Sequence, residues 1–225
     1  MPRTWSLHEQ SHVIMLFERL GALQTGHFRY TSGLHGEVYV AKDLIYPSVL
    51  DFSTMAEAIA REFQDELIDT VVGIAPIANT LAFLTALSLE VETGRPCFAI
   101  AAEKKPRLSD PIMSGSHIGE RLYLSDKIVI RDSFQRFADS MTHVLITEDV
   151  INTGKSVKQL VAVLRGLGVV NISVGCLWNR GGITAEFLDV DNLFSLCDVQ
   201  YAAYEPDDCK LCQEGVPKRT DFGHF

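Results

Sequence analysis

The sequence predicts an α/β fold in which a parallel sheet is flanked by helices. Short apolar runs of strand length recur between residues 70 and 179, namely TVVGIAP, PCFAIAA, HVLIT and NISVGCLWN. Stretches with helical periodicity separate them, and Gly or Pro marks several junctions. Strands that are apolar along their whole length are typical of parallel sheets, because helices cover both faces.

The expected helices follow from the spacing of apolar residues. They span residues 10–20, 53–67, 79–91 and 155–167. Gly21 and Gly168 end the first and the last, and Ser53 is the predicted N-cap of the second. The turn that closes TVVGIAP is expected to precede the third.

Three segments lie outside this alternation. Residues 20–40 contain short β-like runs around 28–30 and 38–40, which predict a hairpin. Residues 103–126 mix charges with Gly, Pro and Ser and predict a long loop, a kind of segment that is usually functional or mobile. The polar residues 206–225 predict a tail outside a single domain formed by residues 1–205.

Composition excludes several classes of protein. The 225 residues have a net charge of −9, which disfavours a broad nucleic-acid surface. No apolar run has membrane-spanning length, and the first residues lack the apolar core of a secretory signal. Five scattered cysteines do not form a disulfide framework, so we expect a reduced, cytoplasmic protein.

The segment HVLITEDVINTGKSV predicts the binding site. Its apolar strand brings Glu148 and Asp149 to the carboxyl end of the sheet, where open α/β folds bind ligands. The turn that follows begins a helix, whose free N–H groups bind phosphate, and the hydroxyls of Thr153 and Ser156 add donors. Two carboxylates beside a phosphate cradle indicate a sugar phosphate with vicinal hydroxyls, together with Mg²⁺.

Two alternatives compete with this interpretation. A P-loop phosphotransferase needs Gly five residues before the Gly of GKS, where this chain has Asp149, whose charge would repel a triphosphate. The acids could also be a solvated strand end, with Asp149 capping the next helix.

VLITEDVINTGKS resembles the phosphoribosyl-diphosphate (PRPP) motif of the type I phosphoribosyltransferases, with Lys155 out of pattern. The resemblance implies the fold of that family. It also implies that the acids bind the ribose hydroxyls and Mg²⁺, the metal either directly or through water. The turn is implied to bind the 5-phosphate. The implied PRPP-binding residues are Glu148, Asp149, Val150, Ile151, Asn152, Thr153, Gly154, Lys155 and Ser156.

Further stretches are similar to the orotate branch of the family. LGALQTGHFRYTSGLHGEVYV is similar to a segment that covers the base, which implies a hood over about residues 10–45. LWNRGG implies that Arg180 contacts the base, and Tyr39 is either a stacking partner of the base or a core residue. The segment that takes the place of the pyrophosphate loop consists of Ala75, Pro76, Ile77, Ala78 and Asn79.

The resemblance implies that Lys104, Lys105 and Arg107 neutralise the leaving pyrophosphate, from a loop that closes over the site and reaches about residue 120. With Asp149 they form the predicted catalytic set. The alternative is a solvated run of charges.

The implied activity is that of a Mg²⁺-dependent pentosyltransferase of pyrimidine biosynthesis. It would transfer ribose 5-phosphate from PRPP to a nitrogenous base and release pyrophosphate, as a homodimer. A non-catalytic PRPP- or nucleotide-binding module is the rival hypothesis. It is supported by Thr31, Ile77 and Ala78, which stand where orotate enzymes usually carry Lys, Lys and Gly.

Cys209 and Cys212 form a C-x-x-C, which is half of a zinc site. Cys197, His224 or the tail of a second copy could complete it, so structural Zn²⁺ is a second candidate metal. A redox role is the weaker alternative, because the pair does not lie between a strand and a helix.

Overall fold

A computed structural model describes residues 7–30, 33–108, 113–114, 117–118, 123–135, 137 and 140–222. The α-helices are α1 (Leu7–Arg19), α2 (Val49–Phe63), α3 (Ala75–Thr93), α4 (Asp132–Gln135), α5 (Lys155–Gly166), α6 (Ala185–Leu188) and α7 (Lys210–Gln213), with 3-10 turns η1 (Lys42–Leu44) and η3 (Pro206–Asp208). The strands are β1 (Leu23–Arg29), β2 (His35–Val40), β3 (Thr70–Ile74), β4 (Phe98–Leu108), β5 (Met113–Ser114), β6 (His117–Ile118), β7 (Tyr123–Ile130), β8 (His143–Ile151), β9 (Asn171–Asn179) and β10 (Asn192–Ser195).

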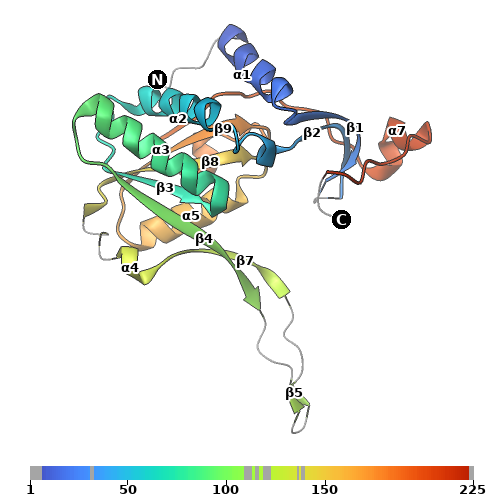
Figure 1. Ribbon diagram of the computed structural model, residues 1–225. Helices are drawn as coiled ribbons and strands as arrows, with labels where there is room; N and C mark the ends of the chain where they lie inside the picture. The colour runs from blue at the N-terminus through green and yellow to red at the C-terminus, as the bar shows by residue number, and fades with distance from the viewer. Residues whose placement is uncertain are drawn as a thin grey trace.

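The central sheet has six strands in the order β10-β9-β8-β3-β4-β7 (Figure 1). Successive side chains of a strand point to opposite faces. Val71 therefore packs in the core with α2 and α3, whereas Val72 packs in the second core with α5. The predicted α/β fold with helices on both faces is confirmed, and the four predicted strands are β3, β4, β8 and β9.

The edge of the sheet at β7 differs from the prediction. β4 continues to Leu108 and pairs with β7 in antiparallel orientation, so the sheet is mixed. Residues 103–108 and 123–126 are therefore strand and not loop, while 109–112, 115–116 and 119–122 lie outside the described residues. Figure 1 shows that β4 and β7 project beyond the rest of the sheet. A ribbon that leaves the core needs no apolar alternation, which explains why the sequence pattern missed it.

Three helices begin earlier than predicted, and α1 does so by three residues, at Leu7. α2 begins at Val49, so Ser53 lies inside the helix and Ser48 is the residue that precedes it. α3 begins at Ala75, directly after β3, and the predicted turn is absent. Pro76 in the first turn suits a helix start, because its missing N–H would have no partner there.

The predicted hairpin is confirmed as β1 and β2, which pair in antiparallel orientation with an irregularity between Thr25 and Phe28. The C-terminal segment lies against it, and isolated bridges join His27 to Lys218 and His35 to Tyr204. Figure 1 shows the hairpin and α7 together on one side of the sheet. Across the described ranges, the helices are too short or too polar to cross a membrane.

Candidate functional site

The acid pair lies at the carboxyl end of β8, the strand between β3 and β9. Glu148 is 5% exposed and Asp149 is 3% exposed. Burial of two adjacent carboxylates is costly unless charges or donors compensate it. The alternative of a solvated strand end is therefore wrong.

Lys42 supplies part of this compensation. Its Nζ lies 2.9 Å from Oδ2 and 3.1 Å from Oδ1 of Asp149. Burial lowers the pKa of Lys42, but the charge of Asp149 and its hydrogen bond outweigh this effect, so the pKa of Lys42 is raised overall. The ion pair joins η1, which follows the hood hairpin, to the end of β8.

Glu148 is less well compensated than Asp149. Burial, followed by the charge of Asp149, raises the pKa of Glu148 well above its ordinary value, although Lys104 and Lys42 oppose the shift. The backbone N–H of Asp149 donates to Oε1 of Glu148 at 3.1 Å. A ligand that brings a cation or hydroxyl donors would stabilise the ionised form of Glu148.

A phosphate-sized cavity lies beside the acids. Its volume is about 110 Å³, and it is lined by Lys42, Lys104, the acid pair and residues 150–157. Gly154 has φ of 70° and precedes α5, so the chain turns sharply there. As the N-cap, Gly154 supplies no side-chain capping hydrogen bond, and the N–H of Lys155 donates to Oγ1 of Thr153 at 3.4 Å, so the first helical turn points its N–H groups at this loop. A Cβ on Gly154 would lie 3.0 Å from Cδ2 of Leu188. This helix start has the geometry of an anion site.

The predicted basic residues lie on β4 and not in a loop. Alternate residues of a strand face opposite sides. Lys104 accordingly lines the cavity of the acid pair, whereas Lys105 lines a separate depression with Lys127, Arg131 and Val163. Arg107 follows in the same strand.

The segment predicted as the pyrophosphate loop, Ala75–Asn79, is the start of α3. Ala78 is 1% exposed, and its carbonyl accepts a hydrogen bond from Oγ1 of Thr147 at 3.2 Å. A Cβ on Gly73 would lie only 2.1 Å from the same carbonyl, so Gly73 allows the close approach of β3 and α3. Ile77 packs against the core. Ile77 and Ala78 are thus part of the packing of α3 against the sheet.

The two residues predicted to bind the base differ in their surroundings. Arg180 follows β9, and its Cζ lies 4.2 Å from the centre of the Tyr30 ring in the hood. Burial raises the pKa of Tyr30 against the opposing charge of Arg180. The centre of the Tyr39 ring lies 5.5 Å from that of Phe28 and 6.1 Å from that of Phe222, so Tyr39 packs among aromatic rings of the hood.

Comparison with known proteins decides the family. No protein-family model matches the chain. The orotate phosphoribosyltransferase of Chlorobium phaeobacteroides (strain DSM 266) is 30% identical over 210 residues, which cover 92% of this chain and 93% of that protein. That of Chlorobaculum parvum is 31% identical over 209 residues, which cover 92% of each. The chain belongs to the orotate phosphoribosyltransferase family.

Solved structures agree on the fold. The orotate phosphoribosyltransferase of Mycobacterium tuberculosis superposes with a TM-score of 0.57 at 19% identity, over 84% of this chain and 95% of that one. The APRTase of Giardia lamblia gives a TM-score of 0.54 at 18% identity, over 81% and 96%. The predicted fold and enzyme class, a pentosyltransferase of nucleotide metabolism, are confirmed, and the P-loop alternative is wrong.

Two residues that were not predicted contact the predicted site residues Asp149 and Arg180. Lys42 follows the hairpin strand in VAKDL, and Tyr30 precedes the hairpin turn. Tyr30 lies in the stretch that is similar to the base-covering segment, and Lys42 follows that stretch, but only the folded hood brings Lys42 to Asp149 and Tyr30 to Arg180. Thr31 lies outside the described residues.

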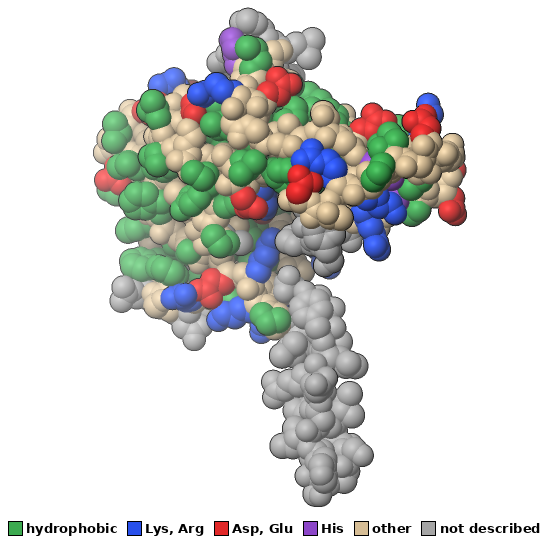
Figure 2. All heavy atoms as spheres, turned by 45° about the vertical axis from the view of Figure 1, so that its right-hand side comes forward, with side chains coloured by type: hydrophobic (Ala, Val, Ile, Leu, Met, Phe, Trp, Pro, Cys, Tyr) green, Lys and Arg blue, Asp and Glu red, His purple; other side chains and the backbone are tan. Residues whose placement is uncertain are grey.

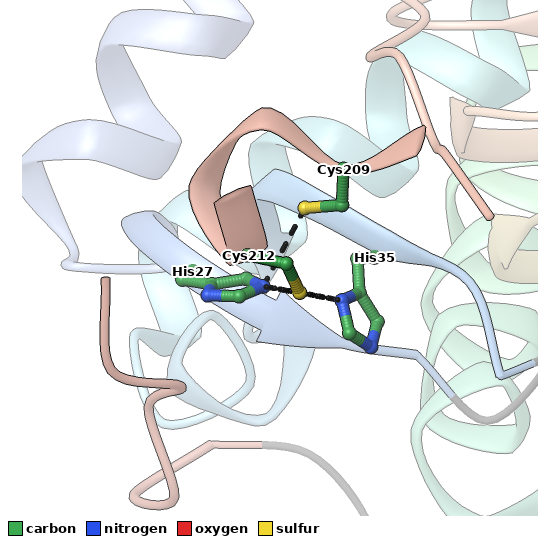
Figure 3. Close-up of side chains that lie close together, drawn as sticks. All are labelled: His27, His35, Cys209 and Cys212. Carbon is green, nitrogen blue, oxygen red and sulfur yellow. Dashed lines mark hydrogen bonds between the residues drawn. The ribbon is translucent and has the colours of Figure 1, made fainter. Parts of the chain in front are cut away.

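The C-x-x-C in the C-terminal segment of this family member lies against the hood. Cys209 and Cys212 cluster with His27 of β1 and His35 of β2 (Figure 3). Cys197, one of the residues that could have completed the set, is instead buried in the core with α2 and α3. His224 lies outside the described residues, and all five cysteines are free of disulfides.

Proposed function

We propose that this enzyme transfers ribose 5-phosphate from PRPP to orotate and releases pyrophosphate. The observation that supports this most directly is the buried acid pair beside a helix start, in one cavity with Lys42 and Lys104. The relatives of about 30% identity are orotate phosphoribosyltransferases, which favours orotate over other bases.

Each part of PRPP has a place in this arrangement. The 5-phosphate would lie on residues 152–156 and the ribose hydroxyls on Glu148 and Asp149. The base would lie under the hood near Arg180, whose planar guanidinium suits a carboxylate. Tyr39, packed among hood aromatics, is the weaker of the two base-contact candidates.

The acid pair fits Mg²⁺. Carboxylate oxygens are ligands that Mg²⁺ prefers, and Lys42 is paired with Asp149 and not with Glu148. When bound, Mg²⁺ supplies positive charge for the pyrophosphate oxygens and the acids. Glu148 and Asp149 would hold it directly or through water.

The residues of the cavity act by position and charge. The bond from C1 to the pyrophosphate oxygen breaks and the electron pair leaves with pyrophosphate, while the base nitrogen bonds to C1 and gives up its proton to water or to the departing pyrophosphate. Negative charge therefore grows on the leaving group, and a cation that is already in place lowers the barrier. Lys104 is such a cation, and the acids stabilise the positive charge that develops on the sugar.

The two neighbouring lysines should differ in their effect on turnover. Lys104→Ala removes a charge from the cavity, and we expect kcat to fall by about 10²-fold. Lys105→Ala is the matched control on the opposite face of β4, where turnover should change less than about threefold on a surface site. Steady-state pyrophosphate release measures both. Equal losses of kcat in the two variants would contradict the proposal that Lys104, and not Lys105, neutralises the leaving group.

The base is tested by pyrophosphate release from PRPP and Mg²⁺ with a panel of pyrimidines and purines. We expect turnover with orotate and at most weak turnover with adenine. Turnover with another base alone would reject orotate. PRPP binding without turnover of any base would support the non-catalytic module instead.

The homodimer is also part of the proposal. Hydrophobic side chains gather on one side of the molecule (Figure 2). Among the exposed ones are Phe83, Leu87 and Val91 of α3, at 61%, 51% and 75% exposure. Their spacing of four residues places them on one helix face, a suitable contact for a second copy. The five free cysteines support a cytoplasmic location.

We expect Leu87→Glu to weaken dimerisation, because a charge would be buried between the copies. Light scattering should give the mass of one chain for Leu87→Glu. The wild type and the control Leu67→Glu, another exposed leucine outside α3, should give twice that mass. A monomeric wild type would contradict the proposal.

A further inference from the structure

The tail is attached to the hood with little apolar packing of its own. η3 and α7 contain no buried residues, and most side chains of residues 203–218 are exposed. Cys209 is the exception, at 1% exposure, and it faces His27 and His35, which are each 2% exposed. Small segments without a core usually need a covalent or metal cross-link to stay folded.

The cluster has the dimensions of a tetrahedral metal site. A Zn²⁺ ion with bonds of about 2.3 Å to sulfur and about 2.0 Å to nitrogen separates S and N ligands by about 3.5 Å and two N ligands by about 3.3 Å. Here Sγ of Cys209 and Sγ of Cys212 each lie 3.6 Å from Nε2 of His27. Nδ1 of His35 lies 3.1 Å from Sγ of Cys212 and 3.2 Å from Nε2 of His27. All four ligand atoms lie within 4.8 Å of one another.

The orientation of His27 is a second, independent observation. Its Nδ1 lies 2.7 Å from the carbonyl oxygen of Val216, which can only accept a hydrogen bond. Nδ1 therefore carries the proton, and in the neutral ring Nε2 directs a lone pair at the cluster. Metal-binding histidines are commonly held by such a hydrogen bond to a backbone carbonyl. Figure 3 shows the side chains of β1, β2 and the tail pointing toward one another.

We propose that His27, His35, Cys209 and Cys212 bind one structural Zn²⁺ that fastens the C-terminal tail to the hood. Two sulfur and two nitrogen ligands in tetrahedral arrangement suit zinc. The four protein ligands leave no open position, so the ion has no role in the transfer reaction. It holds β1 and β2, the strands on either side of the hairpin turn next to Tyr30.

The first test is the metal content of the purified enzyme. Plasma mass spectrometry should give about one zinc per chain. After exchange with Co²⁺, the visible spectrum should show the bands of a tetrahedral thiolate site. Protein prepared with zinc that contains none, or a Cys209–Cys212 disulfide in the freshly purified enzyme, would overturn the proposal.

Substitutions of single ligands test whether the ion binds at this cluster. Cys212→Ser and His35→Gln should each weaken zinc affinity at least tenfold in a competition assay with a chromophoric chelator, and both should lower Tm. Cys97→Ser is the matched control, since this free thiol lies outside the cluster and should leave the zinc content unchanged. If either variant fails to fold, chelation of the wild type should lower its Tm, with recovery on adding Zn²⁺. Full zinc retention in both cluster variants, or a Tm that chelation leaves unchanged, would overturn the proposal.

Discussion

Replacing Asp149 with Asn is expected to lower kcat/KM for PRPP by about 100-fold. The carboxylate is 3% exposed and forms an ion pair with Lys42. In the proposed complex it also accepts a hydrogen bond from a ribose hydroxyl. A hydrogen bond to a buried charged group contributes about 1.5–3 kcal/mol, and each 1.4 kcal/mol is tenfold in rate. Asn keeps the size of the side chain but removes its charge, which also leaves Lys42 without its partner.

The control for Asp149→Asn is Asp43→Asn. Asp43 is an exposed acid next to Lys42, so the same chemical change there should alter kcat/KM by less than about threefold. Steady-state kinetics with varied PRPP compare the two variants, and circular dichroism checks that both fold. If Asp149→Asn retained wild-type kcat/KM, the acid pair would not bind the sugar.

Gly181→Ala should damage both stability and PRPP binding. A Cβ on Gly181 would lie 1.6 Å from the carbonyl oxygen of Asn152, in the turn (residues 152–156) that we propose as the phosphate cradle. The N–H of Gly181 also donates to the carbonyl of Ile151 at 3.1 Å, so the two segments cannot separate without losing this bond. Such overpacking costs about 1–3 kcal/mol, and a displacement of about 1 Å at a substrate-positioning group can cost 10²-fold in rate.

Gly166→Ala is the matched control for this change. Gly166 ends α5, the helix that begins at the cradle, and a Cβ there would meet nothing within 4 Å. Ala is also the better helix former, so stability should stay level or rise by up to about 1 kcal/mol. Thermal unfolding and PRPP titration report both effects. Unchanged PRPP affinity in Gly181→Ala would show that the cradle does not hold the phosphate.

The acid pair and the cradle could be predicted because their residues are consecutive. Residues 148–156 include a strand end, a turn and a helix start, and local sequence specifies all three. The pairing of Lys42 with Asp149 joins residues that are 107 positions apart, and no local pattern indicates it. The hood must fold over the sheet before these two residues meet.

The different surroundings of Lys104 and Lys105 could not be predicted, because they follow from β4 being a strand. In a loop, both lysines would be free to reach the leaving group, and the charged sequence around them predicted a loop. Pairing of Lys104 with Ile128 and of Lys105 with Lys127 fixes the alternation, so one lysine lines the cavity and its neighbour faces away. The backbone of the ribbon supplies this pairing without any apolar pattern.

The four residues of the metal cluster could also be predicted only in part from the sequence. The C-x-x-C is a local signal, and the tail predicts half of a site from its own sequence. His27 is 182 positions from Cys209, and histidines on a hairpin are common without a metal. Only the antiparallel pairing of β1 with β2, and the bridges from the tail, bring the four ligands together.

The most direct measurement is a crystal structure of the enzyme with PRPP and Mg²⁺. We expect the ribose 2- and 3-hydroxyls to donate hydrogen bonds to Glu148 and Asp149, and the 5-phosphate to accept hydrogen bonds from backbone N–H groups of residues 153–156 at the start of α5. PRPP bound away from the end of β8, or bound there with its pyrophosphate on the helix start and its ribose turned away from both acids, would contradict this expectation.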